Sequence, residues 1–111
     1  MISLIDESDL MSQSDKRELR SRLLILIAHL LKLDYLPAFR AHDQAGWQDT
    51  VREQRRGVLR LLRQHPSLRS RLAEAAVAQV YRDAVITVKR EYPGTQFPKI
   101  CPYTVREILR A

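Results

Sequence analysis

The sequence contains few residues of the kinds that cross-link a small protein or interrupt its helices. Among 111 residues there are one cysteine, three glycines and five prolines. The single Cys101 cannot form an intramolecular disulfide, which argues against a disulfide-stapled extracellular scaffold. The glycines at positions 46, 57 and 94 are isolated from one another, so the chain has no glycine-rich phosphate loop.

Long apolar runs are also missing. The longest one, Leu23 to Leu33, is interrupted by His29 and Lys32 and falls short of the ~20 residues that cross a bilayer. No charged start, apolar stretch and small-residue cleavage site follow Met1, as they would in a secretory signal. We therefore expect a cytoplasmic protein without membrane contact, in which the apolar run forms part of the core.

The composition otherwise fits one compact domain over residues 1–111, with 45% hydrophobic and 29% charged residues. The net charge is +6, and 15 of the 19 basic residues are arginines. The first eleven residues carry three acids and no base, so residues 12–111 carry +9. Such an excess favours attraction to polyanions, although the arginines are dispersed along the chain.

The segment from Trp47 to Gln64 shows the clearest helical pattern. At 100° per residue its apolar side chains fall in one arc, at Trp47, Val51, Val58, Leu61 and Leu62. Its basic side chains gather on the opposite side, at Arg52, Arg55, Arg56, Arg60 and Arg63. This pattern predicts an amphipathic helix with an outward arginine stripe. Gly57 lies at the edge of the apolar face, where close contact with a neighbouring helix would explain it.

An earlier helix is predicted to run to about Asp34, capped by Ser12 or Ser14 and surrounded by neighbours on several sides. Pro37 ends it, and a loop over Pro37–Gly46 leads to the striped helix.

The next helix is predicted to begin at His65 or Ser67, with Pro66 suited to its first turn, and to continue to about Tyr92. Val85–Val88 is β-branched, but the helical phase on both sides favours helix there. Pro93 and Gly94 close this helix.

A proline-rich segment follows and is predicted to cross the bundle in an extended path, anchored by Phe97, Ile100 and Tyr103. Thr104 and Glu107 have the spacing of a capping box, which indicates a short last helix. The sequence therefore predicts an all-α bundle of four main helices, with a proline-rich crossing loop before a short C-terminal helix.

Several short motifs follow one another along the chain. They are Lys16-Arg17-Glu18-Leu19, His29-Leu30-Leu31-Lys32-Leu33, Trp47 with Arg52-Glu53-Gln54-Arg55-Arg56, Pro66-Ser67-Leu68, Phe97-Pro98 and Cys101-Pro102-Tyr103-Thr104. In this order they resemble the domain of unknown function family 29 (DUF29). The resemblance spans roughly Leu4 to Leu109. It implies a small, all-helical bacterial protein of a kind found in cyanobacteria and proteobacteria, and it supplies no activity or ligand.

Members of that family usually begin with a further helical segment, whereas this chain starts near the acidic end of that region, at Leu4 to Met11. The resemblance therefore implies that the family's usual N-terminal helix is lacking here. We expect apolar surface left by its loss to be covered by a protein partner, by a second copy or by the first eleven residues.

The histidines and the cysteine give no catalytic or metal-binding pattern. His29, His42 and His65 are far apart and lack a second ligand at metal spacing, so we expect one beside the core helix and two in loops. Cys101 lies between Ile100 and Pro102, without an activating helix start, which favours a packed structural thiol. We expect no cofactor, and no small-molecule ligand is indicated.

Three functions are therefore weighed from the sequence. The first is a non-enzymatic protein-protein interaction module, self-associating or bound to a protein partner. The alternative is non-specific nucleic-acid binding through the arginine stripe, at Arg52, Arg55, Arg56, Arg60 and Arg63. Asp49 and Glu53 beside the stripe favour an ordinary solvated or protein-contacting face instead. An enzyme is least supported, because no convergent set of titratable groups is visible.

Overall fold

The computed structural model describes residues 2–110, with the side chains of residues 2–12, 40, 41, 74 and 75 left undescribed. It contains four α-helices and one 3₁₀ helix within those residues, and no strand. They are α1 (Ile2–Tyr35), α2 (Pro37–Gln64), the 3₁₀ helix η1 (Pro66–Leu72), α3 (Glu74–Glu91) and α4 (Val105–Leu109). The predicted all-α class is confirmed.

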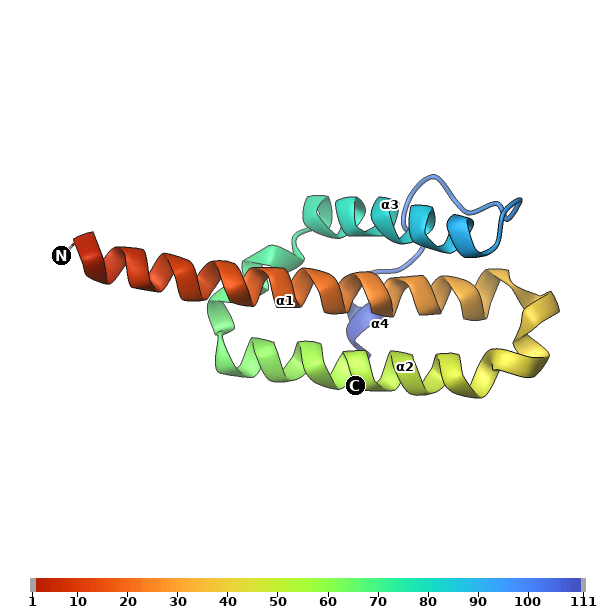
Figure 1. Ribbon diagram of the computed structural model, residues 1–111, viewed down its shortest axis with the longest axis horizontal. Coiled ribbons are helices and arrows are strands. Elements are labelled where there is room, and N and C mark those ends of the chain that lie inside the picture. Colours follow the sequence, from red (N-terminus) through yellow and green to blue (C-terminus); the bar gives the residue numbers. More distant parts are fainter. Residues whose placement is uncertain (1, 111) are drawn as a thin grey trace.

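The long helix α1 is the spine of the molecule. It lies between α2 and α3, which run along its opposite sides (Figure 1). Its 34 residues correspond to ~51 Å at 1.5 Å per residue. The whole chain is 56 Å long and only 24 and 22 Å across. The first turns of α1 extend past the ends of α2 and α3 (Figure 1).

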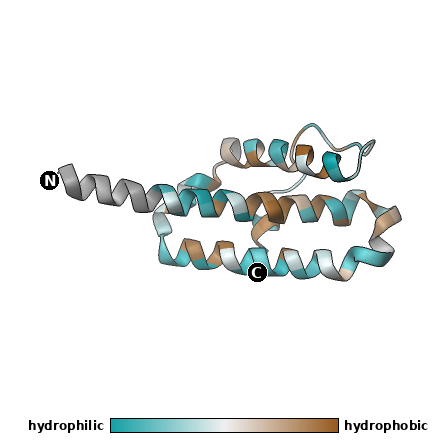
Figure 2. Ribbon diagram, in the orientation of Figure 1, coloured by the Kyte–Doolittle hydropathy of each residue, from teal (hydrophilic) through white to brown (hydrophobic). Residues whose placement is uncertain are grey.

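The core is built on α1. Leu26, Ile27 and Leu31 have no exposed surface, and Leu19 and Leu23 are almost as fully buried. The middle of α1 is accordingly its most hydrophobic part (Figure 2). Each such side chain contributes about 1.5–3 kcal/mol by leaving water. The breadth of this apolar surface explains why α1 packs on both sides, as the sequence predicts.

The apolar arc predicted for α2 is confirmed. All five of its side chains are buried: Trp47, Val51, Val58, Leu61 and Leu62. The helix ends at Gln64, before Pro66.

Gly57 lies against α1, which confirms the close contact inferred from its position. A methyl group added there would lie 2.5 Å from Nη1 of Arg22. The Arg22 guanidinium donates to Gln54 Oε1 on α2 at 3.2 Å and to Glu18 Oε2 one turn away on α1 at 2.9 Å. The glycine therefore makes room for a side chain that bridges α1 and α2.

The predicted starts of the first two helices are wrong. Ser12 and Ser14 do not cap α1, because the helix already begins at Ile2 and both serines lie inside it. No proline or glycine precedes them to prevent helix from forming. The predicted loop over Pro37–Gly46 is also helical. Only Leu36 separates α1 from α2, and Pro37 occupies the first turn of α2, where its missing amide costs nothing.

The predicted helix from Pro66 to Tyr92 is divided in two. Pro66 does stand in a first helical turn, but that turn belongs to η1, and α3 starts only at Glu74. The division falls at Ala73, whose φ of −57° and ψ of 148° are extended rather than helical. The bend allows Leu68 and Leu72 of η1 to reach the core before α3 turns along α1.

The end of α3 is as predicted. Val85–Val88 is helical, and Pro93–Gly94 turns the chain, with Gly94 at a φ of +90° that favours glycine. The extended segment that follows passes behind α1 in the view of Figure 1 and leads to α4. We call residues 95–104 the crossing segment.

Two of the three predicted anchors of the crossing segment are confirmed. Phe97 packs edge-on against Tyr35 of α1, with ring centroids 5.7 Å apart. The Tyr103 hydroxyl donates to Asp34 Oδ2 at 2.6 Å. The prediction that Ile100 is an anchor is wrong, because this residue is 82% exposed. The segment is instead held between these two points by Tyr81 of α3, whose hydroxyl donates to the Pro98 carbonyl oxygen at 2.5 Å.

The predicted capping box begins α4. Thr104 Oγ1 accepts from the Glu107 amide at 3.1 Å, and the Glu107 carboxylate accepts from the Thr104 amide at 3.0 Å. The bond from the Thr104 amide to the carboxylate lowers the pKa of Glu107. Ile108 then places its side chain in the core.

Candidate binding surfaces

Only four of the five arginines that were predicted to form the outward stripe of α2 are exposed. Arg52, Arg56, Arg60 and Arg63 are exposed. Arg52 lies 3.5 Å from Asp49, whereas no carboxylate of the described residues lies within 4.0 Å of the other three. Arg56, Arg60 and Arg63 therefore present three cations at helical spacing on one rigid face.

Arg55 is not part of that outward face, which corrects the sequence interpretation. It turns towards α4, where Nε donates to the Ile108 carbonyl oxygen at 2.9 Å and Nη2 to that of Glu107 at 3.1 Å. The Glu107 oxygen otherwise accepts only a long bond from the Arg110 amide, at 3.4 Å, and a cation beside helix-end oxygens is favoured by the helix dipole. Partial burial and the nearby Arg110 lower the pKa of Arg55. The helical angle already sets Arg55 apart, because at 100° per residue it lies about 20° from Leu62, at the edge of the apolar arc, and about 100° from Arg56.

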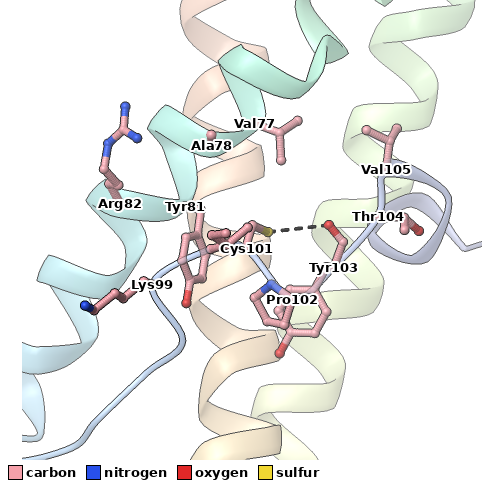
Figure 3. A pocket seen from close by; sticks show the side chains of 11 residues that line it. Val77, Ala78, Tyr81, Arg82, Lys99, Cys101, Pro102, Tyr103, Thr104 and Val105 are labelled. Carbon is pink, nitrogen blue, oxygen red and sulfur yellow. Dashed lines mark hydrogen bonds between the residues drawn. The ribbon is translucent and has the colours of Figure 1, made fainter.

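A pocket of about 540 Å³ lies between α3 and the crossing segment. Figure 3 shows its two walls: Val77, Ala78 and Tyr81 come from α3, while Cys101 and Val105 come from the segment and the start of α4. The volume falls in the range of ligand pockets, and the lining is mainly apolar. Sequence reasoning missed this pocket, although the rigid Pro98–Pro102 stretch was a signal that the chain could stand away from α3 there.

Two cations and one exposed apolar side chain border this pocket. Arg82 and Lys99 line it from α3 and from the crossing segment, and their charged ends lie on its outer side (Figure 3). Ile100, also a lining residue, is the most exposed of the large hydrophobic side chains described. No carboxylate belongs to the described lining. The pocket is therefore apolar inside and basic at its edge.

The thiol and the phenol inside the pocket are held in their neutral forms. Burial raises the pKa of the Cys101 thiol, and its Sγ donates to the Tyr103 carbonyl oxygen at 3.5 Å. Burial also raises the pKa of Tyr81 to about 12. A thiol in this state is a poor nucleophile, because the thiolate is the reactive form. The half-buried position of Cys101 agrees with the packed thiol predicted for it.

The three histidines remain apart. His29 is half-buried on α1, with Nδ1 2.7 Å from the Ile25 carbonyl oxygen, and burial lowers its pKa. His42 lies within α2 rather than in the predicted loop, and His65 stands between α2 and η1, with Nε2 3.3 Å from Asp15. Within the described residues, no three metal-ligating side chains cluster.

Three aromatic side chains form a packed cluster. Tyr92 contacts Trp47, with centroids 6.4 Å apart, and Phe39, with centroids 4.8 Å apart. The Lys32 ammonium stands 6.0 Å from the Trp47 ring and 5.8 Å from the Tyr92 ring, and it pairs with Glu91 at 2.9 Å. A cation of this protein thus already occupies the aromatic cluster, which leaves no cage for an external one.

The helical bundle and its crossing segment define a small all-α protein. The family model described as "Domain of unknown function DUF29" matches residues 1–111. The chain therefore belongs to the DUF29 family. No curated protein and no solved structure matches it. None of the helices described combines the length and apolarity that a membrane span requires.

Proposed function

We propose that this protein is a non-catalytic helical interaction module that self-associates through the pocket between α3 and the crossing segment. The observation that carries the proposal is the exposure of Ile100, 82%, at the edge of an open apolar pocket of about 540 Å³. An isoleucine in that position loses unfavourable contact with water when a second chain covers it. Val77 and Val105 offer the matching apolar walls.

The charge at the pocket edge indicates the chemistry of the occupant. Arg82 and Lys99 attract an acidic segment, and a basic one would be repelled. Within this chain the segment Met1–Met11 has that composition, since it holds three acids, no base and several large apolar residues. The first turns of α1, from Ile2 onwards, extend beyond the bundle (Figure 1). We therefore take a second copy as the occupant.

Reciprocal exchange would close the assembly. If each copy places its first turns in the pocket of the other, the two contacts are related by a two-fold axis and no binding site remains open. Coulombic attraction across the pocket edge and burial of apolar side chains then act together. The attraction is screened by salt, so the dimer should weaken as the ionic strength rises.

Size-exclusion chromatography with light scattering tests this proposal. We expect a concentration-dependent dimer whose dissociation constant rises roughly ten-fold or more in the R82E/K99E variant, because like charges then meet at the pocket edge. The R106E/R110E variant is the matched control, with the same change in charge on α4, and should dimerise as the unchanged protein does. A species that remains monomeric over the whole concentration range would exclude the proposal.

Nucleic-acid binding through α2 is a second candidate, and one observation favours it. Arg56, Arg60 and Arg63 face solvent without a described carboxylate within 4.0 Å. They cover ~10 Å along the helix, which allows contacts to more than one phosphate. Binding of this kind would be non-specific and steeply salt-dependent, because it releases counterions.

Fluorescence anisotropy with a DNA duplex at two salt concentrations tests the second candidate. The R56E/R60E variant should lose binding, whereas the R106E/R110E variant should retain most of it. Arg55 is not a suitable target, because its reversal would remove the hydrogen bonds to α4 as well as a charge. Equal affinity of the R56E/R60E variant and the unchanged protein would reject this function.

A further inference from the structure

Two adjoining hollows lie on the other edge of α3, where α1 meets η1. The first, of about 310 Å³, is lined by Lys16 of α1 and by Ser67, Leu68, Ser70 and Arg71 of η1. The second, of about 210 Å³, lies between α1 and the start of α3. Both hollows include Lys16 and Arg71. The two cations therefore stand where the hollows meet.

The first hollow has the chemistry of a phosphate site. A lysine and an arginine supply charge, and the hydroxyls of Ser67 and Ser70 supply neutral donors. Ser70 Oγ now donates to the Ser67 carbonyl oxygen at 3.1 Å, a bond that a rotation of the hydroxyl can exchange for one to a ligand. No carboxylate belongs to the described lining. Lys16 is half-buried, so its side chain has less conformational freedom than that of a fully exposed lysine.

Asp15 and Asp83, on the two helices that border the second hollow, are already paired with other side chains. Asp15, which precedes Lys16, lies 3.3 Å from His65 Nε2. Asp83 pairs with Arg20, the third cation at the second hollow. Lys16 and Arg71 have no carboxylate of the described residues within 4.0 Å. They are thus the cations available to an incoming anion.

The second hollow has an apolar floor. Leu19 and Leu23 of α1 face Ala76 and Val80 of α3 across it. Its volume exceeds the ~150 Å³ of an apolar cavity that accommodates a benzene molecule. An apolar group of a few carbons or one ring therefore fits here, directly beside the two shared cations.

We propose that these joined hollows bind a small phosphate monoester with a short apolar or aromatic group. The phosphate lies between Lys16 and Arg71 with the two serine hydroxyls as further donors, and the apolar group fills the space between Leu19 and Val80. This site is separate from the pocket near Cys101 and does not depend on self-association.

Titrations of the full chain followed by calorimetry and by amide chemical shifts test the proposal, with inorganic phosphate, phenyl phosphate and phenol as probes. Phenyl phosphate should bind roughly ten-fold more tightly than inorganic phosphate, because its ring is removed from water. Phenol should bind far more weakly than phenyl phosphate. The K16E/R71E variant should lose at least ten-fold in affinity for both phosphates, and R69E, a reversal on the same 3₁₀ helix outside the hollows, should lose little.

The A76L variant separates the two halves of the site. A leucine fills the second hollow, so phenyl phosphate should lose its advantage while inorganic phosphate binds as before. Retained phosphate binding also shows that the variant is folded. Vesicles containing phosphatidic acid form another arm of the test, because a lipid headgroup carries the same phosphate chemistry.

Three results would overturn the proposal. One is equal affinity for phenyl phosphate and inorganic phosphate in the unchanged protein. Another is binding that survives in the K16E/R71E variant, which would indicate an anion attracted only by the overall positive charge. The third is binding to the vesicles without binding to phenyl phosphate, which would indicate a membrane surface instead of a small monoester.

Discussion

Arg55 of α2 holds the carboxyl end of α4, with Nε 2.9 Å from the Ile108 carbonyl oxygen. The capping box holds the other end of the same five-residue helix. A helix this short is unstable in isolation, because its few hydrogen bonds do not offset the cost of ordering it. The two contacts at its ends and the buried Ile108 side chain therefore account for α4.

Replacing Arg55 by alanine should destabilise the protein by about 1–3 kcal/mol, because a charged donor to two helix-end carbonyls is lost. Arg56, the next residue along α2, is exposed and has no such partner, so its replacement by alanine should change stability by less than about 0.5 kcal/mol. Urea unfolding curves of the two variants provide the measurement. Equal stability of the R55A and R56A proteins would contradict the role given to Arg55.

The buried phenol of Tyr81 predicts a loss of stability at alkaline pH. Its pKa is raised from the ordinary 10 to about 12, because burial penalises the phenolate. The contribution of this group to stability is therefore complete below pH 10 and is lost as the pH rises towards 12. Unfolding curves measured from neutral pH to pH 12 should show this decline.

The Y81F variant distinguishes this cause from general alkaline unfolding. It should be less stable than the unchanged protein at neutral pH by about 0.5–1.5 kcal/mol, since the Pro98 carbonyl loses its donor. Its stability should also fall less between pH 10 and 12. A decline of the same size in both proteins would show that Tyr81 is not its source.

Gly57 and Arg22 should be energetically coupled. Alanine at position 57 is favoured by up to ~1 kcal/mol within a helix, but its methyl group displaces the Arg22 guanidinium from between the helices. The G57A change should therefore be close to neutral in the unchanged protein and stabilise the R22A variant by about 1 kcal/mol. A double-mutant cycle by urea unfolding measures the difference. Simple additivity of the two changes would mean that they do not interact.

Ile100 should affect association without affecting folding. Its side chain is 82% exposed, so the I100S change should alter the free energy of unfolding by less than about 0.5 kcal/mol. In light scattering, the same change should weaken the proposed dimer. Lowered stability together with unchanged association of the I100S variant would show that Ile100 contributes to folding and not to the dimer.

Helical periodicity predicted most of the fold because burial and periodicity coincide on α2. Val58 and Leu61 are buried where the apolar arc places them, and Val85–Val88 is helical as its phase suggests. Breaks between helices were harder to predict. Pro37 suits both a helix end and a first helical turn, and the position of Ala73 in the fold, rather than its residue type, produces the break before α3.

The binding surfaces depend on contacts that sequence spacing does not encode. Arg55 lies near the apolar arc, about 100° from Arg56 around α2, but its partner α4 comes more than fifty residues later in the sequence. The hydrophobicity of Ile100 predicted a buried anchor. In the structure the hydrogen bond between Tyr81 and Pro98 fixes the crossing segment so that Ile100 is exposed. Neither the pocket nor the paired hollows is contained in a single segment, so no local motif marks them.

A charge-exchange experiment tests the proposed self-association most directly. One variant, R82E/K99E, carries an acidic pocket edge, and the other, D6K/E7K/D9K, carries a basic first segment. Each variant alone should be monomeric, because like charges then meet in both contacts of its own dimer. The equimolar mixture should form a heterodimer in light scattering, since both contacts become complementary again. A mixture that stays monomeric, or variants that each dimerise alone as the unchanged protein does, would contradict the account.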